Sequence, residues 1–142
     1  MREGEGKVFL DANVLVYAHD VSAGTKHEVA FRMVSNLWKR GDGVLSTQVL
    51  QEFFVIVTRK LPKPMDVSIA QKVISNLLSW EIVVNDGKAI VGAIELLRRY
   101  RYSFWDALIV HAALQSGAAV LFSEDLSSGQ RIRDLRIENP FR

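Results

Sequence analysis

Two acidic residues directly follow apolar segments that have the character of buried strands. Asp11 comes after the run at 7–10, and Asp125 lies just past the run at 119–122. If both runs are parallel strands of one sheet, their carboxyl ends meet at the same edge and bring the two carboxylates there. In α/β proteins ligands bind outside this edge, so it is the first place to look for chemistry.

Two further acids lie on helical stripes that are otherwise apolar. Glu52 has Val49 and Ile56 as its i−3 and i+4 neighbours, and Asp106 is followed by apolar residues three and four positions later. A charged side chain on an apolar face is costly unless a partner compensates it. The sequence places no obvious Lys or Arg near either acid, so a different compensating group is expected.

A divalent cation would resolve the conflict that these carboxylates pose. Mg²⁺ and Mn²⁺ prefer carboxylate and water oxygens, and a bound ion can activate water and neutralise the transition state of a phosphodiester. Without metal, converging carboxylates repel one another, and at least one of them has a raised pKa. The sequence therefore predicts a Mg²⁺ or Mn²⁺ site formed by Asp11, Glu52, Asp106 and Asp125.

Each acid also has an ordinary structural interpretation. Asp11 can cap the helix that follows it, and Glu52 can reach solvent from a helix edge. Asp106 can complete a capping box with Ser103, and Asp125 can stabilise a turn. The metal-site interpretation depends on the set, because all four acids lie where a cleft at the strand ends would collect them.

The elements that position these acids alternate between short apolar strands and amphipathic helices. This alternation is typical of an α/β fold with a mostly parallel sheet. The pattern predicts strands at 7–10, 44–45, 82–84, 119–122 and 135–137, the last of them as an edge strand. It predicts helices at 12–18, 26–40, 46–60, 66–80, 88–100 and 103–116.

Length and composition favour one cytoplasmic domain that covers residues 1–142. The chain has 18 Lys and Arg residues against 16 Asp and Glu, and it contains no cysteine, which excludes disulfides and cysteine-ligated zinc. No apolar run reaches the ~18–20 residues that a membrane helix needs, and the first residues are too acidic for a secretory signal. The histidines lack zinc spacing, and the absence of a Gly-rich phosphate loop disfavours nucleotide binding.

Four short motifs, taken in order, resemble one known family. They are LDANVLVY at 10–17, STQVLQE at 46–52, SFWDALI at 103–109 and LFSEDL at 121–126. Together with IENPF at 137–141, they resemble the PIN-domain family and, within it, the VapC-type toxins of bacterial and archaeal toxin–antitoxin pairs. The resemblance spans nearly the whole chain and implies a three-layer α/β/α sandwich around a mostly parallel central sheet.

The same resemblance implies a metal-dependent endoribonuclease that hydrolyses RNA phosphodiester bonds. Asp11, Glu52, Asp106 and Asp125 match the family's four acids in that order. Asp11 and Asp106 are expected to bind Mg²⁺ or Mn²⁺ directly, while Glu52 and Asp125 bind a second ion or orient water. The sequence leaves open whether one or two ions bind.

Two residues beside these acids support the expected site, and a third is an alternative to the fourth acid. Asn13 matches a polar residue often found two positions after the family's first acid. Ser123 matches the Ser or Thr two positions before the last acid, whose hydroxyl supports the site. Glu124 competes with Asp125 for the role of fourth acid, and we assign that role to Asp125.

The resemblance also implies partners, and other functions stay open. An RNA substrate, a cognate antitoxin protein and a homodimer are expected, without a membrane. One alternative is a PIN nuclease with a housekeeping role, and another is a non-catalytic domain that binds RNA or a partner. A phosphatase with an aspartate nucleophile is the third alternative. Such enzymes usually carry a second Asp two residues after the nucleophile, where this chain has Asn13.

Overall fold

The computed structural model describes residues 6–126 and 128–142. Its strands are β1 (Val8–Leu10), β2 (Gly43–Ser46), β3 (Glu81–Val83), β4 (Val120–Phe122), β5 (Arg131–Ile132) and β6 (Leu135–Glu138). Its helices are α1 (Ala12–Ala18), α2 (Thr25–Arg40), α3 (Thr47–Arg59), α4 (Val67–Leu77), α5 (Gly87–Arg99) and α6 (Phe104–Ser116), with a short 3₁₀ helix at Val21–Ala23.

The strands form one sheet in the order β3-β2-β1-β4-β6-β5. All neighbouring pairs are parallel except β5 and β6, which are antiparallel. The predicted mostly parallel sheet is therefore confirmed. The prediction that 135–137 forms an edge strand is wrong, because β6 lies between β4 and β5. The added edge strand β5 has only two residues, too few to leave a pattern in the sequence.

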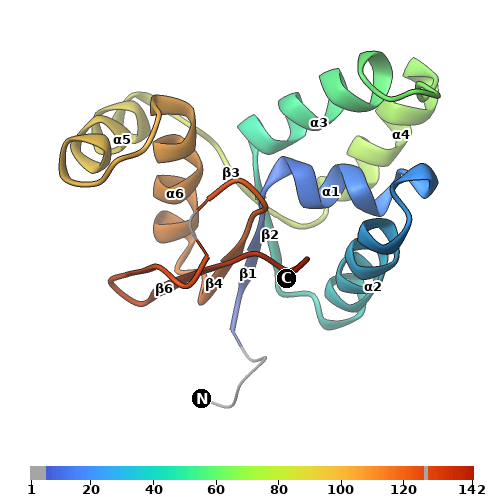
Figure 1. Cartoon of the computed structure of the whole chain (residues 1–142). Coiled ribbons are helices and arrows are strands. Elements are labelled where there is room, and N and C mark those ends of the chain that lie inside the picture. The colour runs from blue at the N-terminus through green and yellow to red at the C-terminus, as the bar shows by residue number, and fades with distance from the viewer. Residues whose placement is uncertain (1–5, 127) are drawn as a thin grey trace.

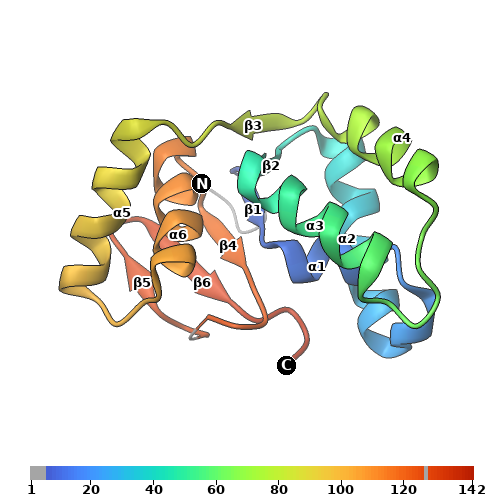
Figure 2. The same cartoon turned by 90° about the horizontal axis from the view of Figure 1, so that it is seen from above.

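Helices cover both faces of the sheet (Figure 1). Helices α5 and α6 lie on one side, and α1 and α2 lie on the other, with α3 packed against α1 and α4 packed against α3 (Figure 2). This arrangement confirms the three-layer α/β/α sandwich. None of the helices in the described ranges is long and apolar enough to cross a membrane.

The core lies between the sheet and its two helical layers. Phe9, Leu10, Leu45 and Leu121 come from central strands and are completely buried. Helix α6 buries the consecutive residues 107–110, so more than one of its sides is covered. Such a helix lies between two layers, with the sheet on one side and α5 on the other.

Three helices next to the predicted site, two of which carry acids of that site, begin with side-chain caps. Asp11 accepts a hydrogen bond from the backbone at the start of α1, and Ser46 caps α3 in the same way. Ser103 caps α6 by accepting from the Asp106 N–H. Because a cap fixes where a helix begins, it also fixes the positions of Glu52 and Asp106 along their helices.

Gly43 begins β2 where the ring of Trp80 packs against its backbone. A methyl group added at Gly43 would lie 2.5 Å from carbons of that ring, so the ring would have to move. We expect Gly43→Ala to lower the free energy of unfolding by about 1–3 kcal/mol. Urea denaturation followed by tryptophan fluorescence measures the change. Gly87→Ala, whose methyl group meets nothing within 4 Å, is the control and should not be destabilised. Unchanged stability in Gly43→Ala would contradict the prediction.

Candidate metal centre

Asp11 and Ser123 lie side by side at the carboxyl ends of β1 and β4. The register pairs Leu10 with Phe122, and the Asp11 N–H donates to the Phe122 carbonyl at 3.0 Å. The Ser123 hydroxyl donates to Asp11 Oδ2 at 2.7 Å, and both side chains are buried. Ser123 therefore holds the Asp11 carboxylate directly.

Asp11 also caps α1, because its Oδ1 accepts from the Ala12 N–H at 2.7 Å. The capping and site interpretations are thus compatible in this residue. Burial raises the pKa of Asp11 above its ordinary range, while the donors on Ser123 and Ala12 lower it. The charges of Asp125 and Asp106 raise it further, so these two carboxylates lie near enough to act on Asp11.

Glu52 faces the same group of acids from α3 and is half-buried. Burial raises the pKa of Glu52, the charge of Asp11 raises it further, and a hydrogen bond with Gln48 lowers it. Asp106 and Asp125 add smaller upward shifts. Because Glu52 responds to all three other acids, its side chain belongs electrostatically to their cluster rather than to free solvent.

Asp106 is likewise half-buried, in the first turn of α6. Its N–H donates to Ser103 Oγ at 3.1 Å, so Ser103 caps the helix that carries Asp106, as the sequence predicted. Burial raises the pKa of Asp106, Ser103 lowers it, and the Asp125 charge raises it. If Asp106 only stabilised the start of a helix in contact with solvent, burial would not raise its pKa.

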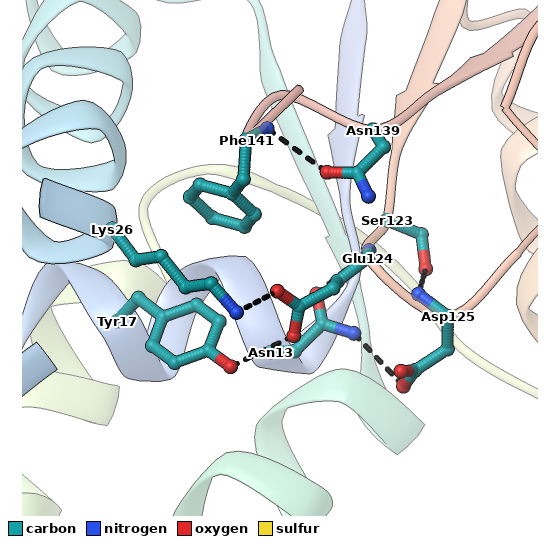
Figure 3. A network of polar contacts seen from close by, with 8 residues as sticks. All are labelled: Asn13, Tyr17, Lys26, Ser123, Glu124, Asp125, Asn139 and Phe141. Atoms are coloured by element: carbon teal, nitrogen blue, oxygen red, sulfur yellow. Dashed lines mark hydrogen bonds and ion pairs between the residues drawn. The ribbon is translucent and has the colours of Figure 1, made fainter.

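Asp125 and Glu124 are adjacent but take part in different contacts (Figure 3). Asp125 is exposed, and its Oδ2 accepts from the Asn13 amide at 3.0 Å. Glu124 instead binds the Lys26 ammonium and accepts from the Tyr17 hydroxyl at 2.7 Å. Burial raises the pKa of Glu124, but the donors on Lys26 and Tyr17 outweigh it, and the pKa lies below its ordinary range. Of this pair, Asp125 is the one whose charge raises the pKa of Asp11, Glu52 and Asp106.

The four acids together form a concentration of negative charge without a cationic partner. In the part of the chain that the structure describes, none of them forms an ion pair with Lys, Arg or His. Oxygen donors of this kind suit Mg²⁺ or Mn²⁺ in their chemistry. Across 6–126 and 128–142, however, no three His or acidic side chains converge closely enough to hold one ion jointly.

Gln48 is a contributor to this region that the sequence analysis missed. Its Nε2 donates to the Trp105 carbonyl at 3.2 Å, which ties α3 to the start of α6 directly before Asp106. Gln48 is itself buried, and its side chain lowers the pKa of Glu52. It lies one helical turn before Glu52, so the i, i+4 spacing was a signal that could have revealed it.

Comparison with known proteins identifies the family. The sequence matches the PIN domain family over residues 8–129, while a search of curated proteins found no match. Among solved structures, the chain is similar to VapC20 of Mycobacterium tuberculosis, described as a toxin that cleaves the sarcin-ricin loop. The two chains are 21% identical and superpose with a TM-score of 0.66. The alignment covers 84% of this chain and 92% of VapC20.

Two toxin–antitoxin complexes have the same fold. VapBC2 from Rickettsia felis, bound to a DNA fragment from its promoter, is 25% identical, with a TM-score of 0.63 and coverage of 93% and 97%. A complex from Klebsiella pneumoniae is 16% identical, with a TM-score of 0.68 and coverage of 94% and 98%. With the family match extending over most of the sequence, this chain belongs to the PIN domain family.

Proposed function

We propose that this protein is a Mg²⁺- or Mn²⁺-dependent endoribonuclease and the toxin of a toxin–antitoxin pair. The observation that carries the proposal is the group of four acids at the carboxyl edge of the sheet of a PIN domain, none of which forms an ion pair within residues 6–126 and 128–142. Membership of this family supports nuclease activity. The VapC structures that resemble the chain support the toxin role.

Asp11 and Asp106 are the proposed direct ligands of the cation, while Glu52 and Asp125 bind a second ion or orient water. A bound Mg²⁺ or Mn²⁺ supplies Lewis-acid stabilisation of the charge that develops on the phosphate oxygens. Ser123 holds the Asp11 carboxylate in one orientation by donating to its Oδ2. Asn13 does the same for Asp125 through its amide. These donors leave other lone pairs of both carboxylates free for a ligand.

Glu52 is suited to orient the attacking water and to accept a proton from it. Its half-buried position raises its pKa, and a carboxylate with a raised pKa is a stronger base near neutral pH. Gln48, one helical turn before Glu52 on α3, donates to the Trp105 carbonyl and so ties the helix of this base to the start of α6. The oxygen of this water would attack phosphorus from the side opposite the 3′ oxygen, and the bond between phosphorus and the departing 3′ oxygen would break.

We further propose a cognate antitoxin, an RNA substrate and a homodimer as the partners of this chain. The structurally similar proteins include toxin–antitoxin complexes, one of them bound to promoter DNA. VapC20 is described as cleaving the sarcin-ricin loop, which supports RNA as the substrate class.

Cleavage of a mixed pool of structured RNA tests the activity. The purified protein is incubated with Mg²⁺, with Mn²⁺ or with EDTA, and cleavage is expected only with metal. Asp106→Asn should lose at least about a hundredfold in rate, because it removes a metal ligand. Asp134→Asn changes an exposed acid outside the cluster and should cleave as the wild type does. Cleavage in EDTA, or no binding of Mn²⁺ in a calorimetric titration, would contradict the proposal.

A further inference from the structure

Glu124 is held by two donors from different helices, although it does not face the four acids. Lys26 on α2 forms an ion pair with Oε2, and the Tyr17 hydroxyl on α1 donates to Oε1 at 2.7 Å. We call Lys26, Tyr17 and Glu124 the Glu124 clamp. Figure 3 shows the Glu124 carboxylate turned toward these donors, whereas the Asp125 carboxylate faces the Asn13 amide. The clamp thus fastens the loop after β4 to both helices.

A continuous series of hydrogen bonds leads from the clamp to the first acid. The Glu124 N–H donates to Asn13 Oδ1 at 3.3 Å, and Asn13 Nδ2 donates to Asp125 Oδ2 at 3.0 Å. The Asp125 N–H in turn donates to Ser123 Oγ at 3.3 Å, and that hydroxyl donates to Asp11 at 2.7 Å. Every bond in the series depends on where the backbone of residues 123–125 lies.

The orientation of the Asn13 amide depends on the Glu124 backbone. Because Oδ1 accepts from the Glu124 N–H, the NH₂ group is the end that faces Asp125. If residue 124 moved away, the amide would lose the partner that sets its direction. Its oxygen could then turn toward the Asp125 carboxylate, where two acceptors would oppose each other.

The end of the chain packs against the clamp. The Phe141 ring meets the Tyr17 ring edge to face at a centroid distance of 5.2 Å, and the Lys26 ammonium lies 5.2 Å from the Tyr17 ring centre. The Phe141 N–H donates to Asn139 Oδ1 at 2.9 Å, which holds the ring in place. The Lys26 ammonium therefore contacts the Glu124 carboxylate and also lies near the rings of Tyr17 and Phe141, which attract a cation.

We propose that Glu124 is a positioning residue, whose clamp on Lys26 and Tyr17 fixes Asn13 and Asp125 in the arrangement that binds the divalent cation. This inference rests on the proposed function, because it concerns the same metal site. It gives the second carboxylate of the loop a role distinct from that of the fourth acid. Glu124 acts through the backbone and through Asn13, without binding the ion itself.

Calorimetric titration of the full chain with Mn²⁺ tests this role. Glu124→Ala is expected to weaken Mn²⁺ binding about tenfold, the lower end of what loss of a supporting partner costs a metal site. Lys26→Met should weaken it in the same direction, whereas Lys26→Arg, which keeps the cation, should restore most of the affinity. In a Lys26→Met/Glu124→Ala double variant the two losses of Mn²⁺ affinity should not add, because both changes remove the same ion pair.

A separate ion pair provides the control for general effects on stability. Lys7 and Glu81 form a pair at 2.9 Å away from the acids, and Glu81→Ala should leave Mn²⁺ affinity unchanged. All titrations are made at a temperature where thermal unfolding curves show each variant to be folded. Wild-type affinity in Glu124→Ala would overturn the inference and leave the proposed nuclease intact. Failure of the wild type itself to bind Mn²⁺ would overturn the proposed function and the inference with it.

Discussion

Replacing Asp11 by asparagine is expected to abolish metal-dependent RNA cleavage and at the same time to stabilise the metal-free protein near neutral pH. Asparagine keeps a side-chain oxygen for the Ala12 N–H and remains a good helix cap. It removes the negative charge that is buried beside Asp106 and Asp125. The residue proposed as a metal ligand is therefore also one that the fold holds at a cost.

The sign of the stability change follows from the pKa of Asp11. Burial raises this pKa above its ordinary value of 3.8, so the folded protein binds the proton more tightly than the unfolded chain does. Above the raised pKa the charged carboxylate destabilises the fold, and stability returns as the pH falls through the raised pKa toward 3.8. The wild type should thus gain stability over this range as the pH is lowered, whereas Asp11→Asn should lack this contribution.

Thermal unfolding with and without metal measures both effects. In EDTA near pH 7, Asp11→Asn should melt at a higher temperature than the wild type. Mn²⁺ at about a hundred times its Kd should stabilise the wild type by about 2.7 kcal/mol, while the variant should show little gain. Asp134→Asn, an exposed acid, is the matched control and should follow the wild type. A variant that melts below the wild type in EDTA, or that still cleaves RNA, would contradict the prediction.

The fold could be predicted because its determinants are local. Apolar strand segments, helical periodicity and caps such as Ser46 and Ser103 lie within a few residues of the elements they specify. Strand order is different, since it depends on contacts between distant segments. The sequence therefore indicated a strand near β6 but not its place between β4 and β5.

The candidate site shows the same division between local and distant information. Each of the four acids was predicted from its position after a strand or on an apolar stripe, and their mutual effects on pKa are consistent with that prediction of a common site. The assignment of the fourth acid to Asp125 over the adjacent Glu124 stays a prediction. The contacts that distinguish the two residues come to Glu124 from Lys26 and Tyr17, about a hundred residues earlier in the chain, so spacing could not reveal them.

Neighbouring residues Glu52 and Phe53 on α3 are expected to give opposite results when replaced. The Phe53 side chain is completely buried, and its ring meets His19 edge to face at 5.2 Å, which joins α3 to the end of α1. Phe53→Ala should lower the free energy of unfolding by about 3–5 kcal/mol, because it removes buried apolar area and leaves a cavity. That is a large part of the ~5–15 kcal/mol that stabilises a typical domain.

Glu52→Gln should instead retain stability and lose cleavage. Burial raises the pKa of Glu52, so removing its charge relieves a cost of folding near neutral pH, as at Asp11. Urea denaturation of both variants, and RNA cleavage at a temperature where both are folded, separates the two roles. Phe53→Leu keeps most of the apolar volume and serves if Phe53→Ala does not fold, and Val55→Ala on the exposed side of α3 is the control. The assignment of Glu52 to chemistry and Phe53 to packing fails if Glu52→Gln cleaves RNA normally or if Phe53→Ala is as stable as the wild type. Side chains one position apart point to different sides of a helix, so one of these residues can reach the acid cluster while the next fills the core.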